Sequence, residues 1–273
     1  MHYSRRLFLA LAAGCGLSTL TLRSAHAQTP RPAARDAPDL KSLIAKATRL
    51  SVLSDRITRS QVQRSLGVLA SRADRVLADS TQEARKLLTE LAASNTAAAT
   101  RSQISAASQA YDGLLKASEK LSITDRPALA QFARLADDVG EAVDKVVELL
   151  IKDSAQPMAG ILSTTADLQR LTQHLGVHFL LARAGVEERE QLKEVAQGRE
   201  EFIKHMAELK KANLKTAQTD GLLQLLDNQW MFMNQALGST GRDVTAMEHV
   251  CTTSERTLEV LTSLYPQYES ALR

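Results

Sequence analysis

Apolar residues recur at three- and four-residue steps along most of the chain after residue 40, and this periodicity constrains the fold more than any other feature. One such run leads from Leu43 through Leu50 to Ile57, and a later one leads from Leu129 to Leu150. A period of 3.6 residues places these side chains on one face of an α-helix. Turn- and strand-favouring residues are scarce, with 12 Gly, 6 Pro and 4% aromatic residues. The sequence therefore predicts an all-α fold of long amphipathic helices.

Polar and proline-containing segments divide this helical pattern. We expect breaks at 95–100, at 122–127 and at 152–157. In the second of these, Thr124 and Asp125 precede Pro127, which is typical of a helix start. The first long run, 40–91, is compatible with one helix or two, because Ser80 and Glu83 have the spacing of a capping box.

The second half of the chain repeats the first. A gapless shift of 118 residues gives nine identities between positions 50–91 and their counterparts, among them Gly67-Val68 with Gly185-Val186 and Glu90-Leu91 with Glu208-Leu209. A single large aromatic residue, Tyr111 or Trp230, follows the Glu-Leu pair in each half, and a turn and a last helix come after it. We therefore expect a tandem duplication, with two antiparallel helical bundles of three or four helices each at 40–156 and 157–273.

The first 27 residues have the features of an export signal. Arg5 and Arg6 precede an apolar run, and Ala25 and Ala27 form an Ala-x-Ala cleavage site. The arginine pair followed by Phe-Leu resembles the twin-arginine export motif. A membrane anchor and a lipoprotein signal ending at Cys15 are the alternatives. We expect cleavage, a flexible leader at 28–39, and a periplasmic mature protein.

The net charge of +3 comes from this signal. The chain has 34 basic and 31 acidic residues, and Arg5, Arg6 and Arg23 account for the whole excess. The mature chain is therefore formally neutral, and its charge gives no reason to expect a nucleic-acid partner. After the signal, no stretch reaches 18 uninterrupted apolar residues, so we expect no membrane span. Two cysteines exclude a disulfide framework and a cysteine-based metal centre.

Residues 47–56 resemble the segment Ala-Gly-x-x-Arg-Met-x-Ser-x-Arg, which opens the sensory domain of PilJ-type chemotaxis transducers and NarX-type nitrate sensors. Further parts of that pattern are similar to the stretches 87–91 and 202–209, to the tryptophan helix around Trp230, and to the closing helix that begins at Ser254-Glu255. The likeness extends over nearly the whole mature chain. It implies a periplasmic four-helix bundle of the type IV pilus methyl-accepting chemotaxis transducer N-terminal family, here without a receptor module.

In that family the bundle dimerises, and in its nitrate-sensing members the arginine before the methionine binds the anion between subunits. Ser51 occupies that arginine position here, and Gln169 occupies it in the second half; neither side chain supplies the paired N–H donors of a guanidinium. Arg56 retains the final arginine of the motif, and His174 is its counterpart. The resemblance thus implies a homodimer and a small, anionic ligand or a signalling partner.

The candidate ligand-binding residues are Arg49, Arg56, His174 and His178. The two histidines are four residues apart, so both imidazoles lie on one helix face and are suited to share a metal ion or a haem. We favour the alternative that they make ordinary polar contacts, and we expect no metal and no cofactor. Arg49, Arg56, Arg59 and Arg64 also follow the first helix, and such stripes are usually solvated faces.

The sequence lacks the motifs of catalysis. It contains no Gly-x-Ser-x-Gly, no phosphate-binding glycine loop and no plausible Ser/His/Asp arrangement, so we expect a protein that is not an enzyme. Cys251 is expected to be buried, and the run 230–233 to lie in the core with one edge outward.

Three functions remain open. Ligand binding predicts a polar pocket near Arg56 or His174. A purely structural or interaction protein predicts an exposed apolar strip and no pocket. A metal- or haem-binding bundle predicts a third donor beside His174 and His178.

Overall fold

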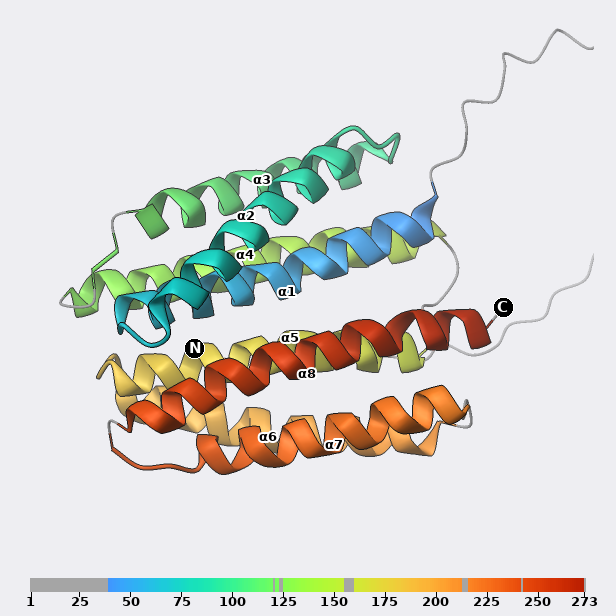
Figure 1. The fold of residues 1–273 in the computed structure, drawn as a ribbon. Coiled ribbons are helices and arrows are strands. Elements are labelled where there is room, and N and C mark those ends of the chain that lie inside the picture. Colours follow the sequence, from blue (N-terminus) through green and yellow to red (C-terminus); the bar gives the residue numbers. More distant parts are fainter. Residues whose placement is uncertain are drawn as a thin grey trace, which may run out of the picture. The chain divides into compact units, whose positions relative to one another are not determined.

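The computed structural model describes residues 39–119, 121–122, 125–154, 160–212, 216–241 and 243–272. In these residues the chain forms helices and their connections, without a strand (Figure 1). The predicted signal peptide with Ala25 and Ala27, Cys15, and all of the predicted leader except Asp39 lie outside the described residues. The described residues form the helices α1 (Leu40–Ser65), α2 (Ala70–Ala92), α3 (Ala98–Glu119), α4 (Arg126–Ser154), α5 (Gly160–Arg183), α6 (Glu188–Lys211), α7 (Ala217–Leu237) and α8 (Val244–Ala271).

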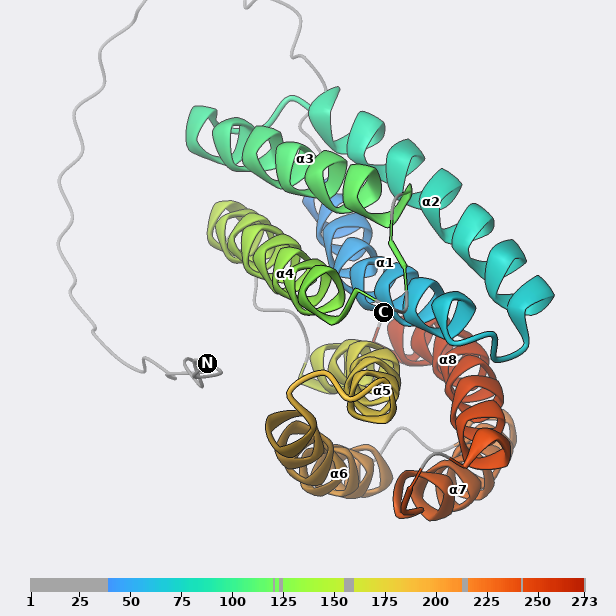
Figure 2. The same ribbon diagram turned by 90° about the vertical axis from the view of Figure 1, so that its left-hand side faces the viewer.

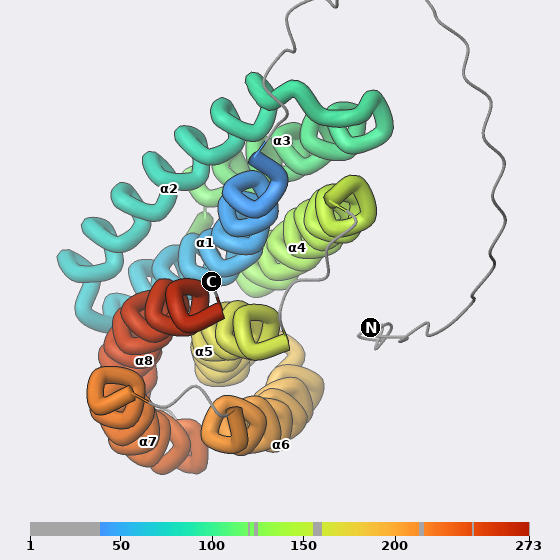
Figure 3. Tube along the Cα trace, turned by 90° about the vertical axis from the view of Figure 1, so that its right-hand side faces the viewer, coloured from blue at the N-terminus to red at the C-terminus, as the bar shows by residue number. Residues whose placement is uncertain are grey.

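The helices pack in two sets, which we name the first group (α1–α4) and the second group (α5–α8). In the first group α1 packs on α2 and α4, and α3 packs on α4; in the second, α5 packs on α6 and α8, and α7 packs on α8. Figure 2 shows the two groups end-on. Helix α1 also packs on α5, which places these two helices in the middle of the molecule (Figure 3).

The hydrophobic core follows the predicted helical period. In α4 the buried side chains lie on one face, from Leu129 through Val139 to Leu150. The core of the second group also takes in Val62 and Val68 of the first. The described residues of both groups belong to one compact unit, Pro38–Arg273, and the predicted boundary at 156–157 falls outside the described residues.

The first long run is two helices, and the break lies before Ser80. Helix α1 ends at Ser65 and α2 begins at Ala70, whereas Ser80 is buried inside α2 and donates its hydroxyl to the carbonyl of Val76 at 2.6 Å. The capping-box interpretation of Ser80 is therefore wrong, because its hydroxyl donates to a carbonyl inside α2 and does not cap the start of a helix. Gly67 supplies the break instead, with φ of +71°.

The turns that end α1 and α5 have the same geometry. Gly67 and Gly185 have φ of 71° and 72°, and the residues two positions later, Leu69 and Glu187, have φ of 47° and 45°. The hydrogen bonds correspond as well: the N–H of Val68 donates to the carbonyl of Gln63, and that of Val186 to the carbonyl of Leu181. These are Schellman-type helix ends, which need a glycine in the left-handed region. All of these positions differ by 118.

The other breaks agree with the sequence. Helix α2 ends at Ala92 and α3 begins at Ala98, and α7 ends at Leu237 before α8 begins at Val244. At the start of α4 the carboxylate of Asp125 accepts the N–H of Ala128 at 2.9 Å, as a capping residue does. Thr124 of the predicted start signal lies outside the described residues.

Candidate functional site

A cluster of buried charge, which we name the junction, lies where α1, α5 and α8 meet. Arg59 of α1 is 1% exposed and Glu255 of α8 is 4% exposed. Both oxygens of Glu255 are bound: Oε1 lies 2.5 Å from Arg59 Nη2, and Oε2 lies 2.5 Å from Arg56 Nη2. Arg56 Nε donates to the same carboxylate at 3.1 and 3.2 Å. The guanidinium groups of Arg56 and Arg59 on α1 therefore both bind the carboxylate of Glu255 on α8.

Neighbouring side chains satisfy the rest of the Arg59 guanidinium. Its Nε donates to Gln173 Oε1 at 2.8 Å and its Nη1 to Gln63 Oε1 at 2.7 Å. Gly176 makes the approach possible, because a Cβ atom there would lie 2.7 Å from Arg59 Cδ. Burial raises the pKa of Glu255, but the charge of Arg59 and the hydrogen bond from Arg56 outweigh it and hold this pKa below its ordinary value.

The two candidate histidines contact each other. Their Nε2 atoms are 2.8 Å apart, and the Nδ1 atom of His178 lies 2.6 Å from Gln191 Oε1 on α6. On the other side, His174 Nδ1 lies 3.7 Å from Asp55 Oδ1 on α1. Burial, followed by the charge of His174, lowers the pKa of His178 to about 3, so its ring is neutral at ordinary pH.

Acidic residues and one arginine extend this cluster towards α4. Arg170 Nε lies 3.5 Å from Asp55 Oδ2, and its Nη1 lies 3.1 Å from Asp144 Oδ2. Gly140 leaves room for this guanidinium, because a Cβ atom there would be 3.0 Å from Arg170 Nη2. Burial raises the pKa of Asp55, but the interactions with His174 and then the charge of Arg170 outweigh burial, and the net pKa is below its ordinary value. For Asp137, burial raises the pKa to about 6.

Arg49 lies away from this junction. Its Nε and Nη2 atoms donate to the two oxygens of Glu83 on α2 at 2.7 and 2.9 Å. Of the four candidate residues, the structure brings the two histidines into contact with each other. Arg56 binds Glu255 on α8, and Arg49 lies in a separate ion pair with Glu83 within the first group.

Sequence reasoning missed the residues that complete the junction, Arg59, Glu255 and Asp55. Arg59 was expected on a solvated stripe, which is wrong, because α1 is enclosed by α2, α4 and α5 at this level. A signal was present in Gly176, since a glycine inside a helix often marks a close approach by another chain segment. Nothing in the sequence indicated that Arg59 was the approaching side chain.

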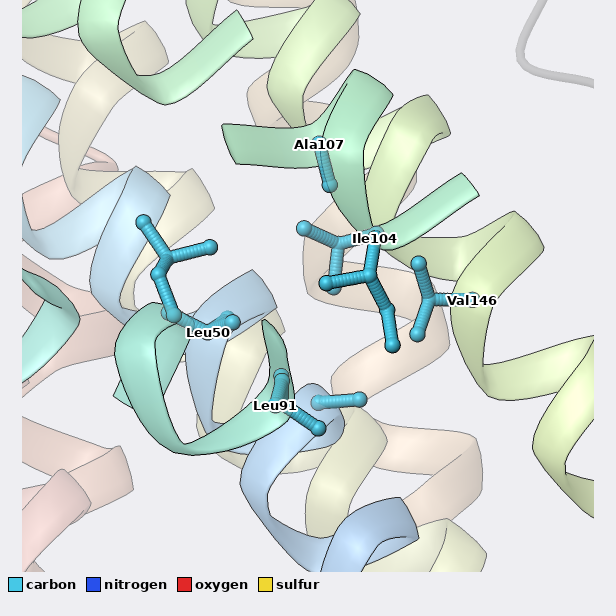
Figure 4. Close-up of a pocket in the computed structure, with 8 residues that line it drawn as sticks. Leu50, Leu91, Ile104, Ala107 and Val146 are labelled. Atoms are coloured by element: carbon cyan, nitrogen blue, oxygen red, sulfur yellow. The ribbon is translucent and has the colours of Figure 1, made fainter. Parts of the chain in front are cut away.

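A small apolar pocket lies inside the first group. It is lined only by aliphatic side chains, among them Leu50, Leu91, Ile104 and Val146 (Figure 4), and it has no room for a water molecule. It is therefore not the polar pocket that ligand binding predicts near Arg56 or His174.

Other predictions concern single residues. Cys251 is buried, as expected, and burial raises the pKa of its thiol to about 11. In the run 230–233, Trp230 and Met233 are buried while Met231 and Phe232 face outward, as expected. In the described part of the chain, no three His, Cys, Asp or Glu side chains are grouped so that they could hold a metal ion.

The comparisons do not assign a family. No model of a known protein family, no curated protein and no solved structure matches the chain significantly. The described helices also include none with the length and apolar character needed to cross a lipid bilayer.

Proposed function

We propose that this chain is an exported, non-catalytic helical-bundle protein of the PilJ-like sensory type, built from two tandem copies of one bundle, that acts by binding a partner protein. The observation that supports a protein partner is a set of half-exposed apolar side chains in the second group. They are Ile203, Met231 and Phe232, with exposures of 54%, 55% and 51%.

Two of these side chains, Ile203 and Met231, lie beside the contact between α6 and α7. Phe202 and Trp230 stack across that contact with ring centroids 3.9 Å apart. The helices are antiparallel, so the residues that follow each ring, Ile203 and Met231, lie on the same side of the stack. Apolar side chains of this size, exposed together, are typical of a protein-binding surface.

The contacts of the candidate ligand-binding residues also favour a partner protein over a small ligand. Arg49, Arg56 and the two histidines already contact side chains of this chain, so a ligand would have to displace Glu83, Glu255 or Asp55. Displacing a buried, hydrogen-bonded carboxylate leaves a charge that must find new partners, at considerable cost.

The proposal of tandem copies rests on the turns after α1 and α5. Their left-handed residues and their hydrogen bonds correspond at a spacing of 118, which is the spacing of the sequence identities. Two unrelated helix ends have no reason to share both the backbone geometry and this register.

In-cell photo-crosslinking tests the partner. A photoreactive amino acid at position 231 is expected to give a discrete larger product, whereas the same group at Leu272, an apolar position 46% exposed at the end of α8, gives none. A product of twice the mass would identify a second copy of this chain as the partner. Equal products at both positions, or none at 231, would contradict the proposal.

A small planar anion is the second candidate, and one observation favours it. Arg56 holds the carboxylate of Glu255 through Nε and Nη2, the edge of a guanidinium that suits nitrate or a carboxylate. A thermal-shift screen with nitrate, nitrite and acetate tests it, because a ligand of the native state raises the Tm. A rise that disappears in Arg56→Gln would support this candidate over the partner protein.

A further inference from the structure

The exposed face of α7 carries no charge over most of its length. Between positions 221 and 238, every exposed residue is a glycine, an asparagine, a glutamine, a leucine, a methionine or a phenylalanine. The acid in this stretch, Asp227, is only partly exposed, and its Oδ1 atom lies 2.6 Å from Lys210 Nζ on α6. Depletion of charge together with exposed Met and Phe is typical of the centre of a protein–protein interface.

The corresponding helix of the first group lacks this apolar face. Helices α3 and α7 begin at Ala98 and Ala217, 119 residues apart, and the same spacing pairs the buried Tyr111 with the buried Trp230. The three exposed apolar residues of α7 have small or charged counterparts at this spacing: Ala106, Asp112 and Gly113 stand where α7 has Leu225, Met231 and Phe232. Packing within a group of helices therefore does not require these apolar residues.

Gly221 is a second feature of this face that packing within the chain does not explain. A glycine inside a helix is less stable than an alanine, and it is often found where another segment approaches closely. Gly176 is such a case, because a Cβ atom there would meet Arg59. A Cβ atom at Gly221 would meet nothing within 4 Å in the described part of the chain. The space above Gly221 is therefore open to a segment of another molecule.

The order of residues around Asn228 is suited to pairing with itself. Leu225 and Met231 lie three positions before and after Asn228, and Gly221 and Gln235 lie seven positions before and after it. In an antiparallel contact of two copies, Leu225 of one copy would face Met231 of the other, and Gly221 would leave room for Gln235. The two Asn228 amides would meet on the two-fold axis, where each can both donate and accept a hydrogen bond.

We propose that the partner protein is a second copy of this chain, held through the exposed faces of the two α7 helices around a two-fold axis at Asn228. This inference rests on the proposed function and names its partner. A two-fold contact sets each residue near the axis against its own copy, so a charge there would meet the same charge. The face without charge meets this requirement. Since the contact is centred on one helix of each copy, we expect a reversible dimer of modest strength.

Charges placed on the axis test this geometry. Asn228 is exposed, so Asn228→Lys and Asn228→Glu should both fold. Each sets two like charges against each other, and the dissociation constant of the dimer should rise more than about tenfold, measured by sedimentation velocity of the full chain over a concentration series. An equal mixture of the two variants pairs opposite charges and should restore the dimer. Gln109→Lys, at the corresponding exposed position of α3, should leave the dimer unchanged.

Gly221→Ala separates dimerisation from folding. The substitution should raise the Tm at a concentration where the chain is monomeric, because alanine is the better helix former. The same substitution should weaken the dimer several-fold, because the added methyl group fills the space that Gln235 of the other copy needs. Unchanged or tighter association of this variant would overturn the proposal.

Three further results would overturn it: a chain that is monomeric at every concentration, a dimer that neither Asn228 variant weakens, and a mixture of the two variants that associates no better than either alone. The proposed function would survive these results if photo-crosslinking at position 231 gave a product whose mass differs from twice that of the chain. Failure of the second copy and failure of the partner surface are thus told apart.

Discussion

The two groups of helices have the same turn between their first two helices and different chemistry beside it. At the 118-residue spacing, Arg56 corresponds to His174 and Arg59 to Val177. Two identical faces would bring like charges together where α1 meets α5. The observed faces differ, so the guanidinium of Arg59 meets the amide of Gln173 at 2.8 Å. The difference shows that the contact between α1 and α5 is formed by unlike side chains at positions that correspond at the 118-residue spacing.

The ends of α1 and α5 differ in the same way. Gln61 and Gln63 are fully buried in α1, and Gln61 donates to the Ser118 carbonyl at 2.8 Å. Their counterparts in α5 are Phe179 and Leu181, which belong to the hydrophobic core of the second group. Polar groups thus fill space in the first group that apolar side chains fill in the second.

The largest effect is expected from Glu255→Gln. Removing this charge leaves the buried Arg59 and the partly buried Arg56 without their carboxylate, and we expect a loss of about 3–5 kcal/mol in the free energy of unfolding, measured with urea. Glu259→Gln, one turn along the same helix and exposed, is the matched control and should change stability by less than about 0.5 kcal/mol. Similar losses for the two variants would contradict a central role for the ion pair.

Acid should destabilise the protein through His178. The unfolded chain takes up this proton near pH 6.5, whereas the folded pKa is about 3, so the stabilising contribution is complete above pH 6.5 and is lost as the pH falls towards 3. Between pH 7 and pH 4 we expect a loss of about 3 kcal/mol from this residue.

His178→Gln is the variant that isolates this contribution. Its stability should fall less between pH 7 and pH 4 than that of the unmodified chain. Asp137 acts in the opposite direction in both proteins, because its raised pKa lets the folded state bind a proton more readily, and the comparison cancels it. Parallel pH profiles would show that His178 is not the group that titrates.

The equivalence of the two turns can be tested with Gly67→Ala and Gly185→Ala. Both residues have φ near +70°, where a Cβ atom is strained, so each substitution should cost about 1–2 kcal/mol. The added atom would approach Arg126 at 3.2 Å in the second turn only, and that exposed side chain can move away. Thermal or urea unfolding should therefore give costs within about 0.5 kcal/mol of each other; a larger difference would show that the turns are not equivalent.

The smallest effect is expected from Arg49→Gln. Its ion pair with Glu83 is only partly buried, with side-chain exposures of 25% and 38%, and such pairs contribute less than about 1 kcal/mol. The loss should shrink further in 1 M salt, measured by urea unfolding. A loss as large as that of Glu255→Gln would remove the distinction between this pair and the central one.

The helices and most of their ends could be predicted from the sequence, because an apolar face and a glycine turn are local signals. The end of α1 was misplaced because Ser80 and Glu83 have the spacing of a helix start, and Gly67 was used only as evidence for the repeat and not as a helix end. The junction was beyond prediction for a different reason. Whether Arg59 is solvated depends on α5 and α8, more than 100 residues away, and no local pattern reports that contact.

Native-state hydrogen exchange of the full chain tests most directly whether the buried junction makes the two groups one cooperative unit. Glu255→Gln is expected to lower the protection of the most stable amides in α3 and in α7 by the same factor, although neither helix contains a residue of the ion pair. A loss of protection confined to the second group, which contains Glu255, would contradict it.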